Sequence, residues 1–182
     1  MRVITGTARG RKLETLEGED VRPTTDRVKE AVFSVIQFET EGRDFLDLFA
    51  GSGQMGIEAL SRGANSAVFV DSAKKSIETV KRNLNTTKLA DKARVAQMDW
   101  QSFLAINSQQ FDIAFLDPPY GKGILQSAMQ QLPAHIKKTG VILAENPLNE
   151  EILSEYGEFV LDRQYRYGKI KISTFRHKDF LV

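Results

Sequence analysis

Short apolar runs alternate with amphipathic stretches over most of the chain, from residue 44 to about residue 145. The runs have the length and composition of buried strands, and the stretches between them repeat their apolar positions at helical spacing. Strands are predicted at 44–50, 67–71, 93–97, 111–116 and 141–145, and helices near 56–62, 73–89, 100–106 and 123–132. This alternation is typical of an α/β, doubly wound, mostly parallel sheet, which binds ligands beyond the carboxyl ends of its strands.

The amino-terminal part follows a different pattern. Residues 1–22 contain short apolar groups separated by glycines, which predicts a small β appendage rather than a helix. A compact linker follows, and from Val28 to Ile36 apolar residues recur at i, i+3, i+4, i+7 and i+8. That spacing predicts a helix with one buried face.

The carboxyl-terminal part changes pattern again after residue 156. Residues 158–165 and 170–175, separated by a turn at Tyr167-Gly168, are predicted to form an antiparallel hairpin at the edge of the sheet. We therefore expect a β appendage over residues 1–22 and one α/β domain over residues 23–182.

A glycine-rich turn follows the first predicted strand. Gly51, Gly53 and Gly56 have the spacing G-x-G-x-x-G between that strand and the next helix. Glycine is needed where the backbone turns tightly and approaches a ligand, and the helix start offers unpaired N–H groups to a polar or anionic group. Asp71, at the end of the second strand, lies 20 residues after Gly51, where a carboxylate is expected to bind ribose hydroxyls. The two features together predict a cofactor that contains a nucleoside.

Composition narrows the class of protein. The chain has 182 residues, of which 41% are hydrophobic, so one domain with a sizeable core is expected. No apolar run approaches the length of a membrane span, and no charged-then-apolar leader opens the chain. The absence of cysteine excludes disulfides, thiolate metal sites and a cysteine nucleophile. A cytoplasmic location is expected.

The net charge of +1 conceals an asymmetry along the chain. Residues 1–12 hold four basic and no acidic side chains, and residues 163–178 hold six basic and no acidic ones. The residues between them carry 15 basic and 23 acidic side chains. Two basic ends around an acidic body suggest a polyanion partner, although charged ends can also serve solubility alone.

A second motif follows the fourth predicted strand. Residues 111–116 lead into Asp117-Pro118-Pro119-Tyr120 at the edge of the sheet where ligands are expected. Proline fixes its own backbone, so the two prolines hold their flanking carbonyls rigidly. The Asp117 carboxylate and these carbonyls are acceptors suited to an amino group, and Tyr120 can stack on a ring. We interpret this loop as a ligand-binding loop rather than a plain turn.

These motifs in combination resemble a known class of enzyme. Asp47-x-x-x-Gly51-x-Gly53, Asp71, Asp99 and Asp117-Pro118-Pro119-Tyr120 resemble the class I S-adenosylmethionine-dependent methyltransferases. Within that class, Arg22-Pro-Thr-Thr-Asp-Arg27, the run from Asp47 to Gly53 and Glu58-Ala-Leu-Ser-Arg-Gly63-Ala are similar to the RsmD family of 16S ribosomal RNA guanine-N2 methyltransferases. The similarity covers nearly the whole chain, and Gln54-Met55 departs from the small and aliphatic residues expected there. It implies a Rossmann-like fold with a seven-stranded sheet.

The resemblance also implies a cofactor, S-adenosylmethionine, and roles for individual residues. The cofactor-binding residues that it implies are Asp47, Gly51, Ser52, Gly53, Asp71, Asp99 and Trp100. Asp71 would bind the ribose, and Asp99 with Trp100 the adenine. From the residues alone, Asp99 can instead cap the helix at 100–106, and Trp100 can instead belong to the core.

The substrate implied by the resemblance is 16S ribosomal RNA, free or within a small-subunit ribosomal particle, with no metal and no membrane involved. The residues expected to bind RNA are Arg9, Arg11, Lys12, Arg22, Thr24 and Arg27, and the catalytic residues are Asp117, Pro118, Pro119 and Tyr120. Asp117 and the Pro118 carbonyl would accept the hydrogens of guanine N2 and direct its lone pair toward the methyl group. Tyr120 would stack on the guanine after it leaves the RNA stack.

Three other functions fit parts of the sequence. The target could be another amine, adenine N6 or a protein glutamine, for which an asparagine in place of Asp117 is more typical. A nicotinamide-dependent oxidoreductase would explain the glycine turn but neither Asp47 nor the Asp117 loop. An RNA-binding ribosome assembly factor without catalytic activity would explain the basic ends but not the intact Asp117.

Overall fold

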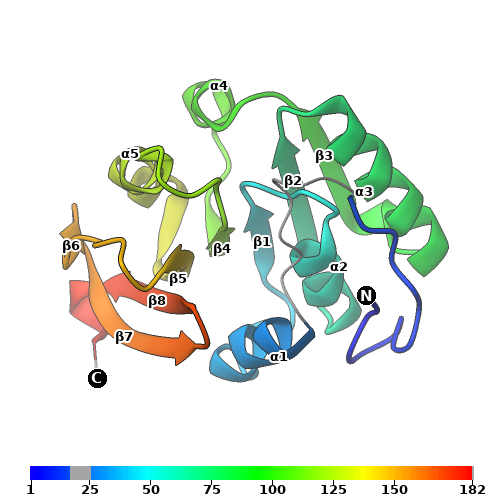
Figure 1. Ribbon diagram of the computed structural model, residues 1–182, viewed down its shortest axis with the longest axis horizontal. Helices are drawn as coiled ribbons and strands as arrows, with labels where there is room; N and C mark the ends of the chain where they lie inside the picture. Colours follow the sequence, from blue (N-terminus) through cyan, green and yellow to red (C-terminus); the bar gives the residue numbers. More distant parts are fainter. Residues whose placement is uncertain (17–25, 182) are drawn as a thin grey trace.

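The computed structural model describes residues 1–16 and 26–181, which form one eight-stranded sheet covered by helices (Figure 1). The strands lie in the order β3-β2-β1-β4-β5-β8-β7-β6. Five of them run parallel to their neighbours: β1 (Asp44–Asp47), β2 (Ser66–Asp71), β3 (Ala93–Gln97), β4 (Phe111–Leu116) and β5 (Ile136–Pro147). Three extend the β5 edge in antiparallel pairing: β6 (Glu155–Tyr156), β7 (Phe159–Tyr167) and β8 (Ile170–His177).

Helices cover both faces of the sheet. They are α1 (Asp26–Val35), α2 (Gln54–Ser61), α3 (Lys74–Thr87), α4 (Trp100–Ile106) and α5 (Ile124–Gln131), with short 3₁₀ turns at Ala90–Lys92, Leu132–His135 and Lys178–Phe180. Alternate residues of the strands point to opposite faces, so the sheet has two cores. The core on one face includes α1, α2 and α3, which we call the α2 face, and the core on the other includes α4 and α5. No helix of the described residues has the length and apolar character needed to cross a membrane.

The predicted α/β class, the parallel sheet and the terminal hairpin are confirmed, with differences in detail. The sheet has eight strands rather than seven, because the two-residue strand β6 pairs with β7. Strand β1 ends at Asp47, three residues before the predicted end, although Leu48 and Ala50 still donate backbone hydrogen bonds to Phe115 and Val70. The apolar run therefore continues past the strand and leads the chain out of the sheet.

Helix α2 begins earlier than predicted and contains one of the three glycines. It begins at Gln54, so Gly56 lies within the helix and not before it. Gly51 and Gly53 have φ angles of +53° and +78°, which favour glycine and make the tight turn between β1 and α2. A Cβ on Gly56 would lie 2.3 Å from Cε1 of Phe69 in β2, so this glycine allows the helix to pack directly on the sheet.

The amino-terminal segment packs on α2 through a buried carboxylate. Residues 1–13 form a narrow loop with an antiparallel bridge between Arg2 and Lys12. The Glu58 side chain, which is fully buried in α2, accepts hydrogen bonds from the backbone N–H groups of Ile4 and Thr5, at 2.8 and 3.0 Å. The predicted boundary between this segment and the α/β domain, at residue 22, lies outside the described residues.

Two cations compensate the buried Glu58 charge. Arg62 Nε donates a 2.8 Å hydrogen bond to Glu58 Oε1, and Lys29 Nζ lies 4.0 Å from Oε2. Lys29 is itself fully buried and donates to the Arg2 carbonyl at 2.6 Å. Burial lowers the pKa of Lys29, while the Glu58 charge opposes that change. One carboxylate thus joins α1, α2 and the amino-terminal segment.

The substitution Glu58→Ala should destabilise the protein by about 3–5 kcal/mol, because it leaves Lys29 as a buried charge and two backbone N–H groups without an acceptor. Denaturant unfolding monitored by circular dichroism measures the loss. Glu78→Ala is the matched control, since Glu78 is a half-exposed residue paired with Lys74 on α3, and its loss should stay within about 0.5 kcal/mol. Equal losses in the two variants would contradict this account of the network.

Candidate active site

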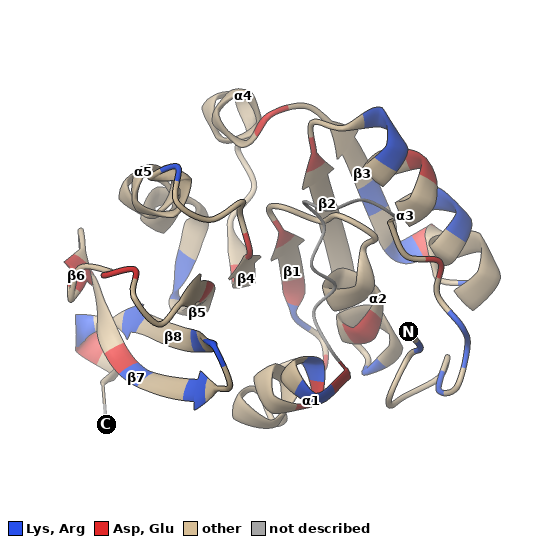
Figure 2. Cartoon of the chain, in the orientation of Figure 1, with Lys and Arg blue, Asp and Glu red and all other residues tan. Residues whose placement is uncertain are grey.

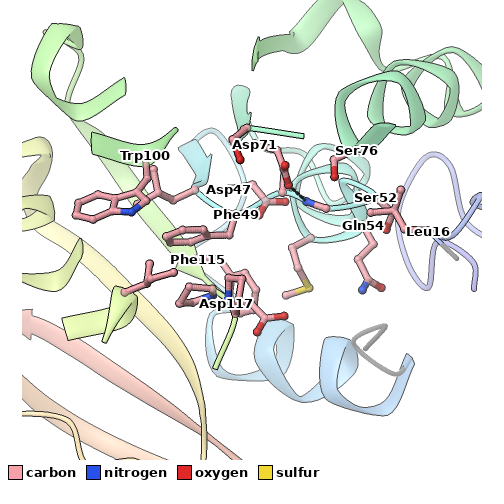
Figure 3. A pocket seen from close by; sticks show the side chains of 18 of the residues that line it. Leu16, Asp47, Phe49, Ser52, Gln54, Asp71, Ser76, Trp100, Phe115 and Asp117 are labelled. Carbon is pink, nitrogen blue, oxygen red and sulfur yellow. Dashed lines mark hydrogen bonds between the residues drawn. The ribbon is translucent and has the colours of Figure 1, made fainter. Parts of the chain in front are cut away.

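A cavity of about 380 Å³ opens at the carboxyl ends of β1, β2 and β4, where the fold class predicts a ligand (Figure 3). Most of the residues singled out in the sequence line it: Asp47, Gly51, Ser52, Asp71, Asp99, Trp100, Asp117, Pro118, Pro119 and Tyr120. Gly53 does not line it, because this residue makes the left-handed turn that begins α2. The fold therefore brings the glycine turn and the Asp117 loop to one cavity.

Two carboxylates fix the glycine turn. Asp71 Oδ2 accepts a hydrogen bond from the Gly51 N–H at 2.9 Å, and Oδ1 accepts one from the Ala73 N–H at 2.8 Å. Asp47 Oδ2 accepts a buried hydrogen bond from the Gly56 N–H at 3.0 Å. Both side chains lie side by side in Figure 3, with Asp117 on the other side of the cavity. The oxygens of Asp71 keep acceptor capacity for hydroxyl donors, since a carboxylate has about four lone-pair positions.

Asp47 has a strongly raised pKa. Burial raises its pKa to about 7, the hydrogen bond from Gly56 opposes that shift, and the nearby charge of Asp71 adds to it. Because the Asp47 carboxylate is already buried, it loses little further solvation when a cation binds to it. The site thus offers a buried negative charge that a positively charged ligand group would stabilise.

Asp99 and Trp100 enter the cavity wall from the start of α4. Asp99 caps this helix: its Oδ1 accepts the Ser102 N–H at 2.8 Å and its Oδ2 accepts the Ser102 hydroxyl at 2.7 Å. These hydrogen bonds lower the pKa of Asp99. Trp100 is 8% exposed and packs in the core of the α4 and α5 face while one part lines the cavity. Asp99 therefore caps the helix and Trp100 belongs to the core, as the two structural alternatives predicted. Contact of either residue with adenine stays a prediction.

The Asp117 loop is supported by a residue that the sequence analysis missed. The Tyr120 hydroxyl donates a 2.8 Å hydrogen bond to Oε1 of Glu145, a buried residue of β5. The Tyr120 ring also packs against the α2 face. The sequence offered one signal for this contact. Glu145 ends a predicted strand that is otherwise apolar, and a buried carboxylate needs a polar partner.

The apolar wall of the cavity was also missed. Its members include Phe49 after β1, Met98 after β3, Phe115 in β4 and Ile124 at the start of α5. Such residues are typical of a core, so the sequence gives no sign that they face a cavity. Their flat and flexible side chains suit an aromatic ring between the carboxylates and the Asp117 loop.

Four basic residues expected to bind RNA lie outside the cavity. Arg9, Arg11, Lys12 and Arg27 are exposed, and none lines the cavity. Arg22 and Thr24 lie outside the described residues. Met1, Thr15 and Leu16 line the cavity instead, so the amino-terminal segment contributes to its rim. Among residues 1–16 and 26–181, no group of three acidic or histidine side chains is placed to bind a metal ion.

The Gln54 side chain bears on whether a cofactor fits the cavity, because it carries a buried acceptor at the cavity wall. Gln54 replaces the small residue expected in the glycine turn, and its side chain lines the cavity. Its Oε1 is buried without a hydrogen-bond partner in the described part of the chain. A buried acceptor of this kind is satisfied by a donor from a bound ligand. Together with Asp47, it suits the ammonium group of an amino-acid moiety.

The substitution Asp47→Asn should stabilise the ligand-free protein, because the wild type must bury a charge once Asp47 ionises. Its folded-state pKa of about 7 exceeds the ordinary 3.8, so the folded state retains the proton between these values. The stability of the wild type relative to Asp47→Asn should therefore fall as pH rises through this interval, by up to roughly 1.4 kcal/mol per pH unit, and then level off. Urea unfolding of both proteins at a series of pH values measures this difference, and parallel pH profiles would contradict it.

Comparisons with known proteins agree with this architecture. A family model described as "Conserved hypothetical protein 95" matches residues 1–176. The chain is 38% identical to "Putative rRNA methyltransferase YlbH" of Bacillus subtilis, over 98% of this chain and all of the relative. It is 39% identical to "Ribosomal RNA small subunit methyltransferase D" of Escherichia coli K12, over 98% of this chain and 90% of the relative.

The solved structures agree as well. The structure titled "Putative methyltransferase yhhF from Escherichia coli" superposes with a TM-score of 0.88 at 31% identity, and covers 97% of each chain. The class I methyltransferase fold and the resemblance to RsmD are thus confirmed. The chain belongs to the family described as Conserved hypothetical protein 95, together with relatives named ribosomal RNA small subunit methyltransferase D.

Proposed function

We propose that this protein is an S-adenosylmethionine-dependent methyltransferase that modifies N2 of one guanine in small-subunit ribosomal RNA. The observation that carries the proposal is the shared cavity: the Asp117 loop, which suits an amino group, faces the carboxylates and the glycine turn, which suit a nucleoside cofactor. The names of the relatives, which include an rRNA and a small-subunit rRNA methyltransferase, support RNA as the substrate.

The cavity has a place for each part of the cofactor. Asp47 and Gln54 would bind the ammonium of its methionine part, and Asp71 its ribose hydroxyls. Its adenine would lie against the apolar wall near Trp100, with Asp99 at the edge. When bound, S-adenosylmethionine supplies an electrophilic methyl group on a positively charged sulfur. The carboxylates Asp47 and Asp71 would favour that cation without touching the reacting atoms.

Catalysis in this arrangement depends on alignment of the amine. The lone pair of guanine N2 is delocalised into the ring, which makes it a poor nucleophile. The Asp117 carboxylate and the Pro118 carbonyl would accept the two N2 hydrogens and turn the lone pair toward the methyl group. Asp117 or a water molecule would accept the proton that N2 loses when it takes the methyl group. Correct placement of two reactants is enough for a large rate gain.

Tyr120 has a different part in the proposal. A guanine in folded RNA must leave its stack to reach the cavity, and an aromatic side chain offsets part of that cost. The hydrogen bond to Glu145 fixes the tyrosine ring, so the stacking surface is ordered before the RNA arrives. Arg9, Arg11, Lys12 and Arg27, which lie outside the cavity, would contact the RNA backbone. Arg22 and Thr24 are proposed to do the same from sequence alone.

The substitution Asp71→Ala should weaken S-adenosylmethionine binding by about 1–3 kcal/mol, because it removes a charged hydrogen-bond acceptor and frees the Gly51 N–H. Isothermal titration calorimetry with the cofactor alone measures this loss. Asp91→Ala is the control, since Asp91 is an exposed acid that does not line the cavity. Unchanged affinity in Asp71→Ala would remove this residue from the cofactor site.

The substitution Asp117→Ala should reduce the single-turnover rate of methyl transfer about 100-fold or more, with little change in cofactor affinity. A group that acts on the reacting amine affects turnover more than binding.

Tyr120→Ala should act mainly on RNA affinity, by about 1–3 kcal/mol, whereas Tyr120→Phe keeps the stacking ring. The assay transfers a labelled methyl group to small-subunit rRNA and identifies the product nucleoside by mass spectrometry.

Each outcome of this assay separates the proposal from its rivals. Near-normal transfer by Asp117→Ala would contradict the alignment mechanism. Methylated adenine as the product would show that the target is adenine and not guanine. Methylation of a protein glutamine would show that the substrate is a protein and not RNA. No transfer by the wild type, to free rRNA or to unmodified small subunits, would favour a non-catalytic assembly factor.

A further inference from the structure

Strand pairing links the hairpin of β7 and β8 to the residue that supports the Asp117 loop, although the hairpin turn is about 50 residues away from that loop in sequence. In the antiparallel pairing of β5 with β8, Ile172 is opposite Glu145 and Ile170 is opposite Pro147. Glu145 is the residue that accepts the Tyr120 hydroxyl. The start of β8 therefore continues the surface that begins at the catalytic loop.

Two tyrosines extend this surface along β7. Tyr165 is opposite Ile172 and Tyr167 is opposite Ile170, so both side chains lie on the same face of the hairpin. Ile170 and Ile172 are buried in the α2 face, and Tyr120 and Tyr167 pack against the same cluster. Tyr165 and Tyr167 each retain part of their surface exposed. Three tyrosines thus lead outward from the cavity on one face of the sheet.

Basic side chains occupy the same end of the hairpin, and those of Arg166 and Lys171 point to the face opposite the tyrosines, because they alternate with Tyr165 and Tyr167 and with Ile170 and Ile172 along the strands. Arg166 and Lys171 are directly opposite each other in the register of β7 and β8, and Lys169 is in the turn between them. Like charges in opposite positions of two strands destabilise the pairing. Figure 2 shows these blue segments gathered at the turn. A polyanion bound here would relieve their repulsion.

The other cations of the hairpin are neutralised by the protein itself. Arg176 lies within 2.6 Å of Glu39 and 3.4 Å of Asp162, and Lys178 lies 2.6 Å from Glu158. By contrast, no carboxylate of residues 1–16 or 26–181 lies within 4.0 Å of a charged nitrogen of Arg166, Lys169 or Lys171. The basic residues of this end therefore divide into a paired set far from the turn and an unpaired set at it.

We propose that the turn end of the hairpin is a second RNA-binding surface, made of Tyr165, Arg166, Tyr167, Lys169 and Lys171. The tyrosines stack on unpaired bases beside the target guanine on one face of the hairpin. The same RNA strand continues around the turn, where Lys169 and, on the other face, Arg166 and Lys171 bind its phosphates. This surface rests on the proposed function, since its partner is the RNA that carries the target. It adds to the amino-terminal cations a site that adjoins the catalytic loop and recognises single-stranded nucleotides.

The stacking part is tested by Tyr165→Ala with Tyr167→Ala, compared with Tyr165→Phe and Tyr167→Phe. The probe is 16S rRNA transcribed in vitro or unmodified small subunits, whichever the wild type methylates. The alanine pair should lose about 30-fold or more in RNA affinity, and the phenylalanine pair, which keeps both rings, should bind like the wild type. The single-turnover rate at saturating RNA and the affinity for S-adenosylmethionine should stay within twofold of the wild type.

The phosphate part is tested by Arg166→Gln with Lys171→Gln. Removal of two phosphate contacts should reduce the slope of log affinity against log salt by up to about 1.4. The matched control, Arg163→Gln with Lys178→Gln, removes two cations of the same hairpin that lie beside acids, and its slope should match the wild type.

The outcomes distinguish this inference from the function on which it rests. If the wild type methylates the RNA but both turn variants bind it like their controls, the inference is wrong and the function stands. The inference is also wrong if the phenylalanine pair loses as much affinity as the alanine pair, because the rings would then serve only to pack the hairpin. If the wild type transfers no methyl group to either probe, the function itself fails.

Discussion

Everything at the cavity depends on two carboxylates that accept hydrogen bonds from the glycine turn. Asp71 holds the Gly51 N–H and Asp47 holds the Gly56 N–H, so the turn and the start of α2 are fixed from two adjacent strands. The arrangement places two acids close together in a largely buried site, and burial raises the pKa of Asp47 to about 7. In the proposed function, a cationic cofactor would offset this cost. The buried carboxylate would thus lower the stability of the ligand-free protein and raise its affinity for a cationic ligand.

The second loop is fixed in a comparable way. Glu145, near the carboxyl end of β5, accepts the Tyr120 hydroxyl and so ties the Asp117 loop to this strand. Because β8 pairs with β5 at the same position, the loop and the terminal hairpin share one support. The Asp117 loop, the Tyr120 ring and the basic turn therefore have defined positions relative to one another. The proposed extraction of one guanine from folded RNA would depend on that order.

Much of the architecture could be predicted from the sequence, because strands buried on both faces and helices with one apolar face leave distinct patterns. The three glycines, Asp47, Asp71 and the Asp117 loop stood out because each residue type is unusual at its position. The features that could not be predicted depend on contacts between residues that are distant in sequence. Phe49 and Phe115 look like core residues, and Glu145 has meaning only through its contact with Tyr120, which is 25 residues away. The end of β1 and the start of α2 were misplaced because the apolar run continues beyond the last paired residue.

The central claim is that this cavity methylates one guanine of small-subunit rRNA at N2, and analysis of that RNA in cells tests it most directly. The 16S rRNA of a strain that lacks this protein is digested to nucleosides and oligonucleotides and compared with the parent strain by mass spectrometry. The account predicts the loss of one N2-methylguanosine at a single position, restored by the wild-type gene. An unchanged set of N2-methylguanosines, or the loss of a methyl group from another base instead, would contradict it.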